Sequence, residues 1–272
     1  PGVALVIKPV DADGNVIVCV AVDANPTEET IYNYVKFPDP DWGTGLGGID
    51  DEEVWGRATS FISGSDDDEF DFWIEFWWMA NASSVPTQTE WAGESFVGVD
   101  GWLVPDAGDQ RLGITPPGLF VQDSGPNSGG AMGVEAPALP LGLDALFGAD
   151  HDFLGYVFQF DQGGDNTKAI WATATDGGDR LSVGHVATTT GSFDDATPQP
   201  EEARITLAAE TTNGVYRGAL VEEGPDGSLG TGDDVETDLV LLCGYVAGRY
   251  FLFGLVEPNG TLAATTIILI EQ

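Results

Sequence analysis

The sequence contains few basic residues. Its 272 residues include 9 Lys and Arg against 45 Asp and Glu, which gives a formal net charge of −36. Clustered Lys and Arg bind the phosphates of nucleic acids, so this composition argues strongly against a nucleic-acid partner. It disfavours an anionic membrane surface for the same reason, and no apolar run approaches the ~18 residues of a membrane span.

Histidine and cysteine are also scarce. His151 and His185 stand in no zinc-protease pattern, nucleophile elbow or triad context, and the chain has no Cys-x-x-Cys pair, so structural zinc is disfavoured. Cys19 and Cys243 lie in apolar runs near opposite ends of the chain. In an exported protein they would form a disulfide, whereas in a reducing compartment both would be buried thiols; the sequence leaves both options open.

The start of the chain and its acidity bear on location. The chain begins at Pro1, without an initiator Met or a charged segment that leads into an apolar one, which favours a mature, exported protein. Asp and Glu suit such a protein because they keep its surface soluble, and they equally suit a protein that gathers divalent cations. We therefore expect an extracellular or cell-surface location.

Strand patterns dominate the sequence. Hydrophobic residues make up 42% of the chain and include 14 Phe, 8 Trp and 6 Tyr, which is ample material for a core. Apolar and polar residues alternate most clearly in Phe70–Met79, and the last third of the chain has the turns of a meander. Helix signals are limited to residues 25–35, 50–62 and 141–147. The predicted fold is all-β: an elaborated antiparallel β-sandwich of jelly-roll type with one to three short helices.

A Gly- and Pro-rich stretch from Pro116 to Pro140 bears on the number of domains. It is too broken for regular structure, so it is either a surface excursion or a junction. The sequence shows no internal repeat. Because all-β folds of this length are often single domains, we predict one domain over residues 1–272, with two packed β domains, 1–125 and 135–272, as the alternative.

The most specific local signal is rich in Asp and Gly. It reads Gly224-Pro225-Asp226-Gly227-Ser228-Leu229-Gly230-Thr231-Gly232-Asp233-Asp234 and is followed by Glu236 and Asp238. Over about a dozen residues it resembles the calcium-binding loops of secreted bacterial surface proteins. Calcium prefers about six to eight oxygen ligands, and glycine lets several carboxylates converge. We expect a calcium cofactor held by Asp226, Asp233 and Asp234, with Glu236 or Asp238 as helpers; the alternative is a solvated hairpin loop.

One face of the strand Phe70–Met79 combines acids with indoles. Alternation places Asp71, Trp73, Glu75 and Trp77 on that face. Sugars stack on Trp, and glycoside hydrolysis needs two carboxyl groups about 5 to 9 Å apart, so a polysaccharide site is one interpretation. The motif of jelly-roll glycosidases is absent. We favour a face that is covered by protein, such as another copy of the chain, because two exposed indoles would leave a large apolar patch.

Together these patterns predict a non-enzymatic, exported structural or surface subunit that is stabilised by calcium and assembles with copies of itself. A carbohydrate-binding β-sandwich or glycoside hydrolase is the first alternative. A viral capsid or tail protein is the second, because composition by itself does not separate it from the others.

Overall fold

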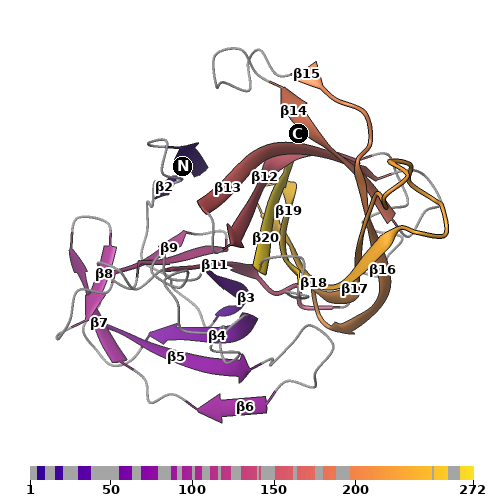
Figure 1. Cartoon of the computed structure of the whole chain (residues 1–272). Helices are drawn as coiled ribbons and strands as arrows, with labels where there is room; N and C mark the ends of the chain where they lie inside the picture. The colour runs from indigo at the N-terminus through magenta and orange to yellow at the C-terminus, as the bar shows by residue number, and fades with distance from the viewer. Residues whose placement is uncertain are drawn as a thin grey trace. The chain divides into compact units, whose positions relative to one another are not determined.

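A computed structural model of the chain (Figure 1) shows strands throughout the residues that it describes. A helical membrane span is absent from this part of the chain. The described residues are 5–9, 16–20, 30–37, 55–62, 69–78, 87–90, 94–99, 102–105, 111–115, 118–123, 130–139, 141, 151–161, 164–174, 180–187, 197–246, 248–256 and 264–272.

The chain divides into two compact units. The first is Pro1–Ala136 with Gln162–Gly164 and Gly244–Gly248, and the second contains the rest: Pro137–Asp161, Asp165–Cys243 and Arg249–Gln272. The main division follows Ala136 and so lies within the Gly- and Pro-rich stretch. Whether the units are independent domains or parts of one elaborated domain stays a prediction.

The first unit contains a two-stranded sheet and a closed barrel. The hairpin pairs β1 (Leu5–Pro9) with β2 (Val16–Val20). The larger sheet has the strand order β4-β3-β11-β10-β9-β8-β7-β5-β6, and a further β4–β5 pairing closes eight of these nine strands into a barrel. Its strands are β3 (Thr30–Phe37), β4 (Trp55–Ile62), β5 (Glu69–Trp78), β6 (Thr87–Glu90), β7 (Glu94–Val99), β8 (Trp102–Pro105), β9 (Arg111–Thr115), β10 (Leu119–Asp123) and β11 (Gly130–Glu135).

A second barrel has the same topology, and its strands belong to the second unit apart from residues 164 and 244–246. Its strand order is β13-β12-β20-β19-β18-β17-β16-β14-β15, and a β13–β14 pairing closes it. Adding nine to each strand number of the first barrel reproduces this order, so one nine-stranded arrangement occurs twice. The strands are β12 (His151–Asp161), β13 (Gly164–Ala174), β14 (Arg180–Ala187), β15 (Thr197–Pro198), β16 (Ala203–Thr212), β17 (Val215–Glu222), β18 (Val235–Val246), β19 (Arg249–Val256) and β20 (Ala264–Glu271).

The predicted jelly-roll sandwich is therefore wrong. A sandwich has two open sheets that pack face to face, whereas here the β4–β5 and β13–β14 pairings close each large sheet on itself. Alternation along a strand is the same in both architectures, because each presents one face to a core. What separates them is the pairing of strands, which the alternation does not encode.

The predicted helices are also wrong where the structure describes them. Residues 30–35 belong to β3, which pairs with β4 and β11, and residues 55–62 form β4. Tyr32 and Tyr34 of β3 are buried, and the aromatic and β-branched residues of this strand favour pairing in a sheet over the helix predicted for residues 25–35. Residues 25–29 and 50–54 of the first two predicted helices lie outside the described residues. Apart from Leu141, the third predicted helix lies outside the described residues.

Side chains fill the second barrel. Alternate residues of its strands contribute to one buried cluster, as expected for the inward-facing positions of a barrel. The cluster consists of Phe153, Ile170, Ala172, Ala174, Leu181, Val183, Ile205, Leu207, Tyr216, Leu220, Leu239, Leu241, Cys243, Leu252, Val256, Ile267 and Leu269.

Cys243 belongs to this cluster, and its backbone N–H donates to Gly214 O over 2.7 Å. Cys19 lies on β2, and its side chain is outside the described part of the structure. The predicted Cys19–Cys243 disulfide therefore stays a prediction.

Two glycines allow close approach of neighbouring strands in the second barrel. A Cβ atom at Gly155 would lie 1.8 Å from Ile268 O, and one at Gly218 would lie 1.9 Å from Thr206 O. Because the obstructing atoms belong to paired backbone, they can move only if the sheet distorts.

We predict that Gly155→Ala and Gly218→Ala each destabilise the protein by about 2 kcal/mol or more, as overpacking against a fixed backbone does. Gly232→Ala is the matched control, because a Cβ there meets no atom within 4 Å. Chemical denaturation of the three variants checks the prediction. Equal stability of Gly155→Ala and Gly232→Ala would contradict the observed β12–β20 spacing.

Candidate functional site

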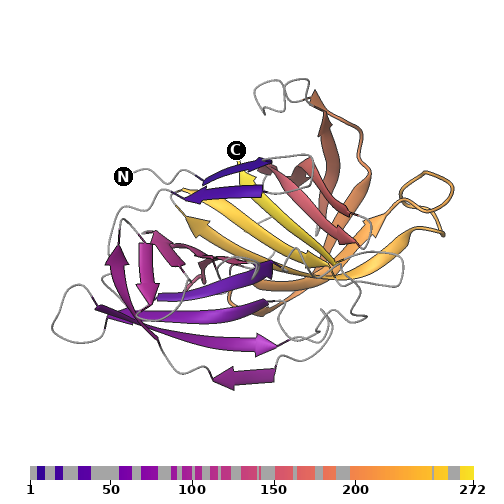
Figure 2. The same cartoon turned by 60° about the vertical axis from the view of Figure 1, so that its left-hand side comes forward.

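The Asp- and Gly-rich segment forms the connection between β17 and β18 (Figure 2). The last residue pair of this hairpin joins Glu222 to Val235, so residues 223–234 make up the loop. Gly227 and Gly230 have φ values of 68° and 88°, which lie in the left-handed region that favours glycine. These glycines let the loop turn back on itself and bring its acidic side chains together.

Three carboxylates of the loop converge on one hydroxyl group. Thr231 Oγ1 lies 2.6 Å from Asp233 Oδ1, 3.3 Å from Asp234 Oδ1 and 3.4 Å from Asp226 Oδ1. Ser228 O lies 3.1 Å from the same hydroxyl oxygen. A hydroxyl carries one proton, so it satisfies one of these acceptors at a time. The centre of the loop is therefore crowded with oxygen atoms and rich in negative charge.

The same carboxylates also accept hydrogen bonds from the loop backbone. Asp226 N donates to Asp233 Oδ2 over 3.2 Å, and Gly230 N donates to Asp234 Oδ2 over 2.7 Å. Ser228 N donates to Asp226 Oδ1 over 2.9 Å, which is the geometry of an Asx turn. As they stand, the side chains serve the turns of the loop. Among the described residues, no group of three or more His, Cys, Asp or Glu is arranged to hold a metal ion.

Hydrogen bonds within the loop stabilise the ionised form of Asp233. The Thr231 hydroxyl has the largest effect and, together with the Asp226 N–H, lowers the pKa of Asp233 below the usual carboxyl value. A lowered pKa in the folded state adds stability that is present above the pKa of the unfolded chain and is lost as the pH falls through the folded value. The loop is thus expected to loosen in acid.

The structure brings together three of the five predicted calcium ligands. Asp226, Asp233 and Asp234 share the Thr231 cluster, whereas none of the cluster's hydrogen bonds in the described loop involves Glu236 or Asp238. These two residues lie on β18, exposed, opposite Val221 and Ala219. The predicted role of both residues as helpers stays a prediction.

The predicted ligand or interface face lies on β5. Register places Glu75 opposite Arg57 of β4 and opposite Glu90 of β6. In the same way, Trp73 is opposite Thr59, Trp77 is opposite Gln88, and Asp71 is opposite both Phe61 and Ser95. The side chains of these residues lie outside the described part of the structure, so the prediction that protein covers this face stays a prediction.

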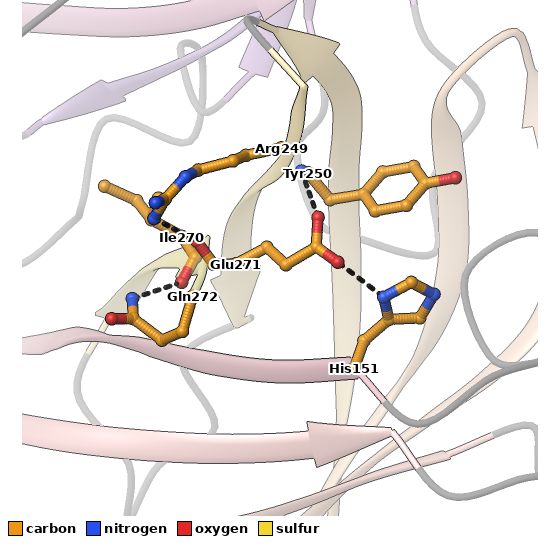
Figure 3. A network of polar contacts seen from close by, with 6 residues as sticks. All are labelled: His151, Arg249, Tyr250, Ile270, Glu271 and Gln272. Carbon is orange, nitrogen blue, oxygen red and sulfur yellow. Dashed lines mark hydrogen bonds and ion pairs between the residues drawn. The ribbon is translucent and has the colours of Figure 1, made fainter.

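Sequence reasoning missed a contact between His151 and Glu271 in the second barrel (Figure 3). His151 Nδ1 lies 2.6 Å from Glu271 Oε1, and both side chains are 18% exposed. Glu271 Oε2 accepts a hydrogen bond from Tyr250 N over 2.9 Å, and Glu271 O accepts one from Arg249 Nη1 over 3.0 Å. Glu271 thereby joins β12, β19 and β20 at one end of the barrel. No sequence pattern indicated this contact, because its partners are 120 residues apart.

A second histidine contact joins His185 of β14 to Glu202, with Nδ1 against Oε1. Nearby, Gln199 N donates to His185 O and Trp171 Nε1 donates to Gln199 O. These contacts attach the segment between β15 and β16 to the neighbouring strands. His151 thus lies in a contact that links two strands, and His185 lies in one that links a strand to a connecting segment.

The depressed pKa of Asp233 depends on the Thr231 hydroxyl. We predict that Thr231→Val raises the pKa of Asp233 toward the usual carboxyl value, since it removes the hydrogen bond that acts most strongly on this group. Thr231→Ser retains the hydroxyl and should preserve the low pKa. Titration of the Asp233 carboxyl by NMR measures both. A low pKa that persists in Thr231→Val would show that the backbone donors alone suffice.

No family model matches the sequence, and no curated protein does. Two solved structures resemble the chain weakly. Transferrin binding protein B, isotype 1, from serogroup B Neisseria meningitidis is 8% identical, with a TM-score of 0.35 over 81% of this chain and 52% of its own. A double mutant of transferrin binding protein B from Haemophilus parasuis Hp5 is 8% identical, with a TM-score of 0.37 over 96% of this chain and 63% of its own. The chain thus covers less than two thirds of both proteins, and likeness at these TM-scores assigns neither fold nor function.

Proposed function

We propose that this protein is a non-catalytic, exported structural or surface subunit whose second barrel is stabilised by calcium bound in the β17–β18 loop. The observation that carries the proposal is the convergence of Asp226, Asp233 and Asp234 on Thr231 Oγ1, with all three carboxylates within 3.4 Å of this atom. Ser228 O supplies a fourth oxygen close to the same point.

The donor set suits calcium in chemical type. Calcium is a hard cation that prefers carboxylate, carbonyl and hydroxyl oxygens, and these are the atoms gathered around Thr231. The loop is glycine-rich and mostly exposed, so rotation of the side chains away from their N–H partners can turn the oxygens toward a cation without rebuilding a packed core. In a chain of net charge −36, a divalent cation would also relieve repulsion among the acids.

Binding would stabilise the hairpin that carries the loop. β17 and β18 are aligned over eight residue pairs from Val215↔Leu242 to Glu222↔Val235, so a cation that tightens the loop also holds the ends of two barrel strands together. Calcium-binding modules of extracellular proteins work at about 10⁻⁴ to 10⁻³ M. At ten times the dissociation constant, linkage stabilises the folded state by about 1.4 kcal/mol.

We predict that calcium raises the melting temperature of the protein and that Asp233→Asn with Asp234→Asn removes most of this shift. Asp161→Asn with Asp165→Asn is the matched control, because it also removes two charges but alters residues on β12 and β13 that are not predicted calcium ligands. Thermal unfolding in calcium and in EDTA compares the variants. An undiminished shift in the first double variant would rule out the loop as the binding site.

We also propose that the protein assembles with copies of itself through the β5 face that carries Trp73 and Trp77. The support is the density of indoles on one strand, which would otherwise expose a large apolar patch.

Trp73→Ala is then expected to lower the native mass or the stability of the protein, because the indole packs against protein. Native mass spectrometry with and without calcium, combined with thermal unfolding, measures both effects. A variant of unchanged mass and stability that had lost affinity for a polysaccharide would instead support an open sugar site.

A further inference from the structure

Arg204 of β16 is anchored beside the β17–β18 loop. Its Nε donates to Glu201 Oε1 over 2.9 Å and its Nη2 donates to Glu201 Oε2 over 3.1 Å, so the two groups form a paired fork. The side chains of Arg204 and Glu201 are 22% and 30% exposed. Register places Arg204 between Ser182 of β14 and Val221 of β17, close to the point where β17 enters the loop.

The remaining arm of the guanidinium reaches the loop. A Cβ atom built at Gly230 would lie 3.3 Å from Arg204 Nη1, so this nitrogen lies against the loop backbone. Gly230 N in turn donates to Asp234 Oδ2 over 2.7 Å. The hydrogen bonds with Glu201 have the largest effect in raising the pKa of Arg204, and the charge of Asp234 acts in the same direction. Arg204 is therefore held by Glu201 on one side and lies beside the acidic loop on the other.

We infer that Arg204 is a built-in counter-ion of the β17–β18 loop, which holds the loop against β16 in the absence of metal and weakens the binding of calcium. The first part needs no ligand, whereas the second rests on the proposed calcium site. The geometry favours arginine over lysine, because the planar fork uses two nitrogens on Glu201 and still directs a third toward Gly230.

The expected effects follow from electrostatics near a surface. A fixed positive charge beside the carboxylates reduces their mutual repulsion when no metal is bound, and it repels a divalent ion that enters. Because the pair is partly exposed, solvent and salt screen it, so the change in calcium affinity should be about three- to tenfold and no larger.

The first experiment is done in EDTA, where calcium plays no part. Hydrogen exchange of the Gly230 and Thr231 amides is measured by NMR in the wild type, Arg204→Gln and the control Arg249→Gln. The control also removes one positive charge. Arg249 is the first residue of β19, which follows the end of β18 that is remote from the β17–β18 loop. Faster exchange at both amides in Arg204→Gln alone supports the inference. Unchanged amide exchange in Arg204→Gln overturns the holding role, by which Arg204 keeps the loop against β16. This outcome does not depend on whether the protein binds calcium.

The second experiment titrates calcium alone into the same three proteins at one salt concentration and follows binding by calorimetry. If Arg204→Gln binds calcium about three- to tenfold more tightly and the affinity of Arg249→Gln is unchanged, the result supports the opposing role, by which Arg204 weakens the binding of calcium. Equal tightening in both variants would reflect net charge and overturn that role, and so would unchanged affinity in Arg204→Gln. If no protein binds calcium, the proposed function and the opposing role fail together, while the exchange experiment still decides the holding role.

Arg204→Lys tests both roles if Arg204→Gln folds poorly. It keeps the positive charge but loses the fork, so it should exchange faster at Gly230 and Thr231 while its calcium affinity stays within about twofold of the wild type. Affinity that rises in the lysine variant as well would contradict an electrostatic cause. Slow, wild-type exchange in that variant would contradict the need for the fork.

Discussion

Each barrel depends on the pairing that closes its sheet. In the second barrel, β13 and β14 are aligned over five residue pairs from Ile170↔His185 to Ala174↔Leu181, and in the first, β4 and β5 are aligned over six. An open sheet would leave the N–H and C=O groups of both outer strands without partners in the sheet. Closure gives these groups partners and encloses an interior. Alternate side chains of each strand then point either into this interior, where they form the core, or outward to the surface.

A filled interior has a consequence for function. Eight strands enclose a space about as wide as the side chains that point into it, and in the second barrel large residues such as Phe153, Tyr216 and Leu241 occupy that space. Binding groups then belong to the connections at the ends of the strands. The β17–β18 loop is such a connection: the strands on either side of it are paired, and this hairpin places its acidic residues.

Several carboxylates of the second barrel have hydrogen-bond donors or a positive charge close to them. Asp226, Asp233 and Asp234 each accept N–H or O–H donors from their own loop, and Arg204 adds a positive charge beside Asp234. Glu271 contacts His151 and accepts from Tyr250 N. Such contacts do not cancel a net charge of −36, but they place donors next to these carboxylates.

The sequence by itself determined the strands and the acidic loop. The alternation in Phe70–Met79 and the turn residues around Gly227 depend on neighbours along the chain, and such local patterns can be read without a structure. The convergence of Asp226, Asp233 and Asp234 was predictable for the same reason, since the three residues lie within nine positions. The helix signal at residues 25–35 was equally local, but over residues 30–35 the pairing of β3 with β4 and β11 prevails.

Only the tertiary structure decided the rest. The barrel needs both the β13–β14 pairing that closes it and the pairing of β12 with β20, and the second of these spans more than a hundred residues. The contact between His151 and Glu271 follows from the pairing of β12 with β20. The position of Arg204 beside Gly230 follows from the hairpins β16–β17 and β17–β18. The repetition of one strand order, without a repeat in the sequence, is likewise visible only in the structure. A period of two specifies which side chains share a face, but it does not specify which strands pair, because that choice depends on backbone hydrogen bonds, some of them between strands as remote in the chain as β12 and β20.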